Sequence, residues 1–174
     1  MPYLCLPADT MKADNRIYYA EDAGNYYLRF VGDVRVTFCV TLSSYLDRLF
    51  ITENIESVVV DLKSAKAVDS TTLGFLAKLA LFLHNKRNLQ PLLMVDDPSM
   101  IRLLESMGID ELFSFVSELP ESVDQVKELP FSSADNDEAR LKVIEAHKIL
   151  MGMNIKNMNV FSELVKSLEG EGLK

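Results

Sequence analysis

The sequence predicts an α/β fold: a mixed, mostly parallel β-sheet with an N-terminal edge hairpin, packed with α-helices and followed by a C-terminal helical hairpin. Three observations lead to this prediction. Two strand-like segments flank a turn signal, apolar runs of strand length then alternate with helix-length segments, and two amphipathic segments follow a polar linker. Because strand–helix–strand connections are right-handed crossovers, the later strands should be parallel neighbours.

The first half of the chain contains the hairpin and a buried strand. RIYYAED and NYYLRFV are rich in aromatic and branched residues, and the turn signal DAGN (Asp22 to Asn25) lies between them. GDVR (Gly32 to Arg35) ends the second strand. Thr37 to Phe50 has apolar residues at helical spacing, and Ser57 to Leu62 is a continuous apolar run typical of a central strand.

The second half continues the alternation. In order, we expect a helix at Ser70–Lys86, a buried strand at Gln90–Asp96, a helix at Pro98–Gly108, a strand at Glu111–Ser117 and a short helix at Pro120–Leu129. Proline near the first position and glycine at the end are the residues that helix termini favour.

The chain divides into three parts. Residues 1–14 are expected to be a loose lead-in, residues 15–130 the α/β domain, and residues 131–174 a helical extension. The linker PFSSADND introduces the extension, whose helices are expected at Glu138–Met151 and Asn157–Leu168. Isolated helices of this length are marginal in water, so they must pack on the domain, on a second copy or on a partner.

Composition excludes several classes of function. The 174 residues carry a net charge of −8 and show no cluster of Lys or Arg, which argues against nucleic acids and anionic membranes and favours a protein partner with a basic rim. The longest apolar run is broken by Lys78 and is too short to span a bilayer. Without a signal-peptide pattern, and with Cys5 and Cys39 placed unfavourably for a disulfide, a cytoplasmic location is expected.

The sequence also gives little support for an enzyme. It contains no glycine-rich phosphate loop, no G-x-S-x-G motif and no Cys/His cluster with metal-ligand spacing, so we expect no catalysis, cofactor or metal. His84 and His147 are interpreted as surface or half-buried helix residues far from any nucleophile. Asp96 and Asp97 are interpreted as a solvated turn.

A run of hydroxyl groups follows an acid at the start of the helix at Ser70–Lys86. Asp69 or Ser70 as a helix cap explains part of the run Asp69-Ser70-Thr71-Thr72, but not why three hydroxyls follow the acid. The same helix carries a second apolar stripe, formed by Phe75, Leu79 and Phe82. That stripe is either covered by the extension or left as a contact surface.

VDSTTLGFL at this strand–helix junction resembles the core motif of STAS domains, and most of all that of the small bacterial anti-sigma factor antagonists. GDV at Gly32–Val34 and PSMIRLLESMGIDELF at Pro98–Phe113 also fit, so the resemblance covers about Arg16 to Leu129. It implies a STAS-like fold. Thr72 stands where many relatives have glycine, and the helical extension is not part of the minimal domain.

The resemblance implies that Ser70 is a phosphoacceptor. By position, Asp33, Asp69, Thr71, Thr72 and Phe75 are expected to contact the partner. That partner would be a serine kinase that is also an anti-sigma factor, bound and sequestered by the unphosphorylated chain and released on phosphorylation. A serine phosphatase would reverse the modification. Two alternatives remain: a non-catalytic subunit of a transport ATPase complex, and a scaffold that forms a homodimer through its extension.

Overall fold

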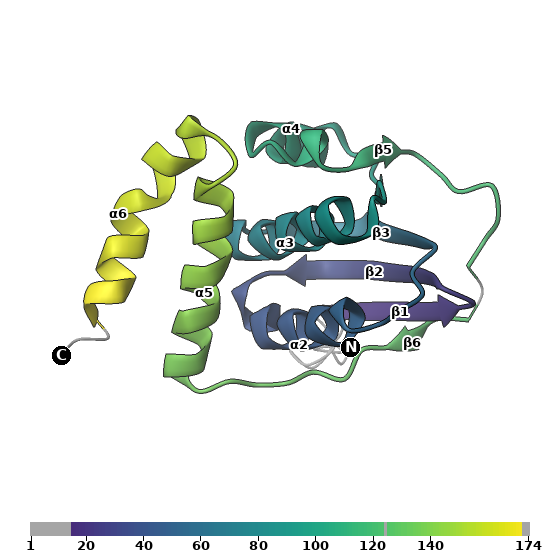
Figure 1. Cartoon of the computed structure of the whole chain (residues 1–174), viewed down its shortest axis with the longest axis horizontal. Helices are drawn as coiled ribbons and strands as arrows, with labels where there is room; N and C mark the ends of the chain where they lie inside the picture. The colour runs from purple at the N-terminus through teal and green to yellow at the C-terminus, as the bar shows by residue number, and fades with distance from the viewer. Residues whose placement is uncertain (1–14, 124, 172–174) are drawn as a thin grey trace, which may run out of the picture.

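The computed structural model describes residues 15–123 and 125–171, which fold around a six-stranded sheet in the order β5–β4–β3–β2–β1–β6 (Figure 1). The strands are β1 (Arg16–Asp22), β2 (Asn25–Val34), β3 (Ser57–Val68), β4 (Leu92–Met94), β5 (Ser114–Val116) and β6 (Lys127–Glu128). Strands β2 to β5 are parallel neighbours, and β1 pairs antiparallel with β2 and β6. The predicted fold class is confirmed; the lead-in expected at residues 1–14 lies outside the described residues.

The predicted hairpin forms from β1 and β2. Ala23 and Gly24 occupy its two-residue turn with φ angles of 48° and 86°, and two left-handed residues in succession match the twist of paired strands. A side chain at Gly24 would also meet Glu56 Cγ at 2.7 Å. This turn sets the register in which Asp22 pairs with Asn25.

Helices cover one face of the sheet. They are α2 (Cys39–Phe50), α3 (Ser70–Arg87) and α4 (Pro98–Ser106), with 3₁₀ turns at Val36–Phe38 and Ile109–Glu111. Phe30 of β2 and Val60 of β3 point to this face and are fully buried, as are Leu73 and Leu76 of α3. Figure 1 shows α2 and α3 lying in front of the strands.

The opposite face of the sheet carries a smaller apolar cluster centred on Tyr27, Val59 and Met94. The Tyr27 hydroxyl donates a hydrogen bond to Asp61, and Arg29 Nε donates to the same hydroxyl at 3.0 Å. This network gives partners to the carboxylate of Asp61, which is otherwise removed from water.

Two sequence expectations need correction. No described residue of Pro120–Leu129 is helical; Lys127 and Glu128 form β6 instead, and the Leu129 N–H donates to the Ile17 carbonyl at 2.7 Å. Strand β3 also continues past Leu62 to Val68, because its polar second half stays paired with β2.

The extension forms a helical hairpin from α5 (Asn136–Met151) and α6 (Ile155–Glu171). In Figure 1, α5 runs across the end of the domain where β2 finishes and α3 begins, and α6 lies on its far side. Ala146, Leu150 and Phe161 of the hairpin belong to the same apolar core as β3 and α3. The extension therefore packs on its own domain.

Candidate functional site

The site is the junction between the end of β3 at Val68 and the start of α3 at Ser70, which we call the corner. Asp69 lies at this junction and accepts hydrogen bonds from α3 and from the segment after β2. Asp69 has an extended backbone and is the N-cap of α3. Its Oδ1 accepts from the Thr72 N–H at 3.0 Å, and its Oδ2 accepts from the Val36 N–H at 2.8 Å. One carboxylate thus satisfies a free N–H group of α3 and fixes the segment after β2 against it.

Thr72 ties α3 to the end of β2 from the other side. Its hydroxyl donates to the Val34 carbonyl at 2.9 Å, and the whole residue is buried. Asp33, which precedes Val34 in β2, is exposed and pairs in register with Ala67 of β3. The Asp33 N–H donates to Asn15 Oδ1 at 2.9 Å. The corner therefore joins the ends of β2 and β3 to the first turn of α3.

Ser70 is the first residue of α3, and its hydroxyl bonds to the extension. The distance from Ser70 Oγ to His147 Nε2 is 2.7 Å, and His147 Nδ1 lies 2.7 Å from the Val143 carbonyl oxygen. A carbonyl oxygen only accepts, so Nδ1 carries a proton and donates to it. In the neutral tautomer that this bond selects, Nε2 is the acceptor and the Ser70 hydroxyl donates to it.

Two further contacts seat α5 on α3 beside this hydrogen bond, and a third joins α5 to α6. A Cβ atom added at Gly74 would lie 2.4 Å from the Ala146 carbonyl oxygen, so the two helix backbones meet at this glycine. Lys78, one turn further along α3, forms an ion pair with Glu145. On its outer side the His147 ring packs edge-on against Phe161 of α6, with 5.0 Å between ring centroids.

The expected site residues occupy different environments. Asp69, Ser70 and Thr72 meet at the corner, and Asp33 lies at the exposed end of β2 beside it. Ser70 and Asp69 are half-buried, whereas Thr71 and Thr72 are buried. We expected Phe75 on a partner-binding surface; the structure instead places it in the core, fully buried.

Sequence reasoning missed the role of His147. The expectation that both histidines lie far from any nucleophile is wrong for His147, which is 2% exposed and bonded to Ser70. His84 is half-buried on α3, as interpreted. The one available signal was that His147 falls on the apolar face of its helix with Ile144. That pattern predicts an inward position, but it does not identify a partner 77 residues away.

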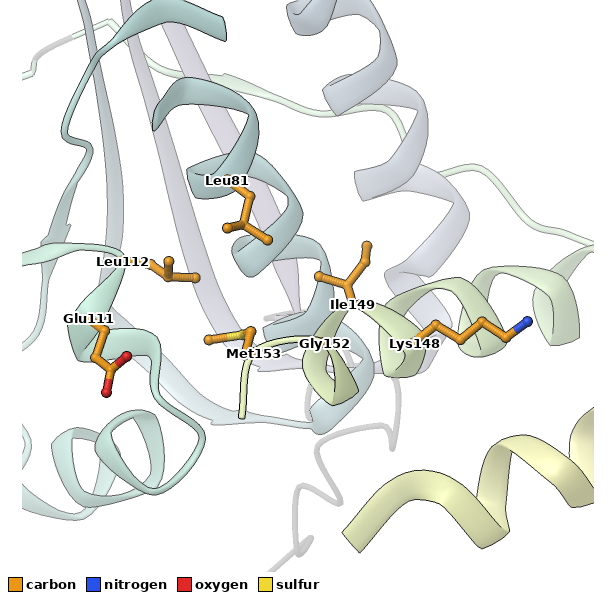
Figure 2. Close-up of a pocket in the computed structure, with 7 residues that line it drawn as sticks. All are labelled: Leu81, Glu111, Leu112, Lys148, Ile149, Gly152 and Met153. Atoms are coloured by element: carbon orange, nitrogen blue, oxygen red, sulfur yellow. The ribbon is translucent and has the colours of Figure 1, made fainter. Parts of the chain in front are cut away.

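The arrangement holds a hydroxyl against a base, as in nucleophilic enzymes, but among residues 15–123 and 125–171 no carboxylate is bonded to the other ring nitrogen of that base. His147 Nδ1 is oriented by a backbone carbonyl rather than a carboxylate. A hollow of about 350 Å³ lies further along the interface, lined by Leu81, Ile149 and Met153 among others. Figure 2 shows these side chains around it and the end of Lys148 pointing away. Neither Ser70 nor His147 lines this hollow.

Among residues 15–123 and 125–171, no group of three or more His, Cys, Asp or Glu side chains is placed to hold a metal ion. In the same part of the chain, no helix has both the length and the apolar character needed to cross a bilayer.

No protein-family model and no curated protein sequence matches the chain. Among solved structures, it is similar to the anti-sigma factor antagonist SpoIIAA in its unphosphorylated form, with 11% identity, 55% of this chain and 96% of that chain covered, and a TM-score of 0.46. It is also similar to the Bacillus cell fate determinant SpoIIAA in the phosphorylated form, with 11% identity, coverage of 59% and 92%, and a TM-score of 0.49. Sequence identities and TM-scores this low do not support an inference about the partner or activity of the chain.

Proposed function

We propose that this chain is a non-enzymatic, STAS-like regulator that binds a regulatory protein through the corner around Ser70. The unphosphorylated form sequesters that protein, which is an anti-sigma factor with serine-kinase activity. A phosphate on Ser70 releases it, and a serine phosphatase restores binding. Asp33 and Asp69 border the corner and contribute to the docking surface, with the buried Thr71 and Thr72 supporting it from inside.

One observation carries this proposal: the Ser70 hydroxyl takes no part in the bonds that build the corner. Asp69 accepts hydrogen bonds from the Thr72 and Val36 N–H groups, and the Thr72 hydroxyl donates to the Val34 carbonyl. The Ser70 hydroxyl bonds instead to His147 of the extension. A group added to Ser70 can therefore change what the corner contacts while the domain keeps its fold. If the Ser70 hydroxyl were instead a structural cap, a group added to it would weaken the fold of the domain.

Magnitudes favour an effect on binding over an effect on folding. Phosphoserine adds about −1.5 to −2 charges at neutral pH. At a helix N-terminus a negative charge is favourable by about 0.3–1 kcal/mol, so α3 tolerates it. Burying the same charge in an interface without a counter-ion costs several kcal/mol. A cost of about 4 kcal/mol corresponds to nearly a thousandfold weaker binding.

The test begins with the chain isolated from cells that produce it, followed by intact-mass measurement and phosphosite mapping. Proteins captured with it are then titrated against the wild type, Ser70→Ala and Ser70→Asp. We expect a phosphate on Ser70, retained binding by Ser70→Ala and binding weakened at least about a hundredfold by Ser70→Asp. Ser99→Asp places the same charge near the start of a different helix, α4, and should bind like the wild type. Equal affinity for all four proteins would contradict the proposal.

The identity of the captured protein decides between this function and the transport alternative. A serine kinase or sigma-factor regulator supports the switch. A transporter ATPase, bound equally by Ser70→Ala and Ser70→Asp, supports a non-catalytic transport subunit in which Ser70 is only a contact.

The outer surface of the hairpin favours a second candidate function, homodimerisation through the extension. Large apolar side chains are exposed there: Leu141, Ile155, Met158, Val160 and Leu164. Burying such a patch between two copies would be favourable by about 25 cal/mol per Å² of apolar surface. Molar mass measured by light scattering should fall from dimer to monomer on Val160→Glu. A monomer at every concentration in the wild type would exclude this role.

A further inference from the structure

We infer that the α5–α6 hairpin is an autoinhibitory cover over the Ser70 corner, and that a phosphate on Ser70 and the docked hairpin exclude one another. This inference rests on the proposed function, because it assigns the regulation of that same site. In the docked state the hairpin holds the hydroxyl that a kinase must reach. When the hairpin is released from the unphosphorylated chain, Ser70 and the adjoining face of α3 are open to the partner. In the phosphorylated chain the hairpin is also released, but the charge on Ser70 excludes the partner.

In the docked state the hairpin is hydrogen-bonded directly to the Ser70 hydroxyl. The Ser70 hydroxyl donates to His147 Nε2, and the ring that accepts it is 2% exposed. Phosphoryl transfer from ATP forms a bond between Oγ and the γ-phosphorus, breaks the bond to the ADP oxygen so that ADP leaves, and passes the hydroxyl proton to a base of the kinase or to water. The proton that must leave is the one shared with His147, and α5 stands beside the oxygen that must attack. A kinase therefore needs α5 to withdraw first.

The product of that transfer fits the docked state poorly. Once Oγ is an ester oxygen it has no hydrogen to donate, so Nε2 is left as a nearly buried acceptor without its donor. The phosphate dianion would also lie close to that lone pair and to the Asp69 carboxylate, which already serves two N–H groups. A favourable pairing would require an imidazolium in a ring packed against Phe161 and largely removed from water.

The charged groups nearest this part of α5 are already paired with one another. Lys78 of α3 contacts Glu145 and lies 3.9 Å from Asp47 of α2, and Lys142 lies 3.7 Å from the same Glu145. Drawing either lysine toward a phosphate would break these pairs. The docked hairpin therefore holds no unpaired cation among these groups to receive the new charge.

The hairpin contacts the domain through the Ser70 bond, through the buried side chains of Ala146, Leu150 and Phe161, and through Asn157 Nδ2, which donates to the Met107 carbonyl at 3.0 Å. Beside Leu81 and Met153 this interface opens into the hollow, so it is not closed along its whole length. The hairpin has internal bonds that survive release: Arg140 Nη1 donates to the Leu168 carbonyl at 3.1 Å, and Lys148 pairs with Glu169. The exposed segment 130–133 then serves as the hinge, held to α2 by hydrogen bonds between Ser132 and Thr41.

The test uses the full chain with phosphoserine installed during translation at position 70, and hydrogen exchange followed by mass spectrometry. We expect amides of residues 141–150 in α5 to exchange at least about tenfold faster than in the unmodified chain. Amides of residues 58–62 in β3 should be unchanged. Phosphoserine at position 99 is the matched control and should leave α5 protected. Equal or slower exchange of α5 with phosphoserine at position 70 would overturn the inference.

Two substitutions test the same contact without phosphate. Ser70→Ala removes the donor alone and should speed exchange of α5 several-fold, because His147 Nε2 then lacks its partner. His147→Ala should do the same if β3 remains protected. If His147→Ala does not fold, Ser70→Ala carries the test, and wild-type protection of α5 in Ser70→Ala would count against the inference.

Failure of the inference and failure of the proposed function can be told apart. Phosphate on Ser70 in cells together with unchanged protection of α5 would refute the cover and keep the switch. Opening of the hairpin by installed phosphoserine, with no phosphate found in cells, would keep the coupling and refute the switch.

Discussion

At the scale of single residues, Asp69 has the largest structural role in the corner. Its two oxygens accept from the Thr72 and Val36 N–H groups, so Asp69→Ala leaves two donors without partners. We expect the free energy of unfolding to fall by about 2–3 kcal/mol in urea denaturation with an unchanged m value. Asp97→Ala removes the cap of α4, whose side chain accepts from the Ser99 N–H, and should cost about 1 kcal/mol. Equal losses would show that the Val36 bond adds nothing.

Tyr27 gives the chain a pH dependence in the alkaline range. Burial, followed by the hydrogen bond to Asp61, raises its pKa to about 12. The folded state therefore favours the neutral phenol. Its contribution to stability is complete below the pKa of an unfolded tyrosine, about 10, and is lost as pH rises toward 12. Burial also raises the pKa of Tyr45, which reinforces the trend.

Absorbance at 295 nm, which follows tyrosine ionisation, checks this prediction. In the wild type we expect one phenol to ionise near pH 12, above the usual range, and Tyr27→Phe should remove that step. The loss of stability between pH 10 and 12 should also be shallower in Tyr27→Phe. Titration of every tyrosine near pH 10 in the folded protein would contradict the buried network.

At the scale of secondary-structure elements, the packing of α3 against α5 depends on Gly74. A methyl group there would lie 2.4 Å from the Ala146 carbonyl oxygen and 2.7 Å from its Cβ, so one helix backbone must shift. We expect Gly74→Ala to lower the free energy of unfolding by about 1–3 kcal/mol. Gly170→Ala in α6 is the control, because a Cβ there meets nothing within 4 Å; it should be neutral or slightly stabilising. A neutral Gly74→Ala would mean that the helices are not in contact at this point.

The sequence patterns predicted best the helices and strands that are buried either on one face or on all sides, because these have a regular or continuous apolar pattern. The hairpin turn, the apolar run of β3 and the length of α3 all follow from local residues such as Gly24 and Val60. The helix expected at Pro120–Leu129 was wrong because pairing of Lys127 and Glu128 with β1 decides that segment, and strand preference depends on such neighbours. The second half of β3 was missed because its exposed Lys63 and Lys66 look like a polar turn.

At the scale of the whole molecule, the location of the extension was beyond what the sequence could predict. An amphipathic face requires that a helix be covered, but it does not name the surface that covers it. The Asp69 cap of α3 lies within four consecutive residues and was expected from the sequence; the bond from Ser70 to His147 joins residues 77 positions apart and was not. The structure adds that the extension completes the core through Ala146, Leu150 and Phe161.

That placement leads to a last prediction about cooperativity. The hairpin shares the core, yet it is tethered by segment 130–133 and has its own internal contacts, so it should open as a unit before the sheet unfolds. In hydrogen exchange at increasing, sub-denaturing urea concentrations, amides of α5 and α6 should merge onto one opening reaction. Its free energy and urea dependence should be lower than those of β3. Helix α2 belongs to the domain and is the internal control, so its most protected amides should follow β3. If α5 opens only with β3, the two form one cooperative unit, and release of the hairpin would require unfolding of the whole domain.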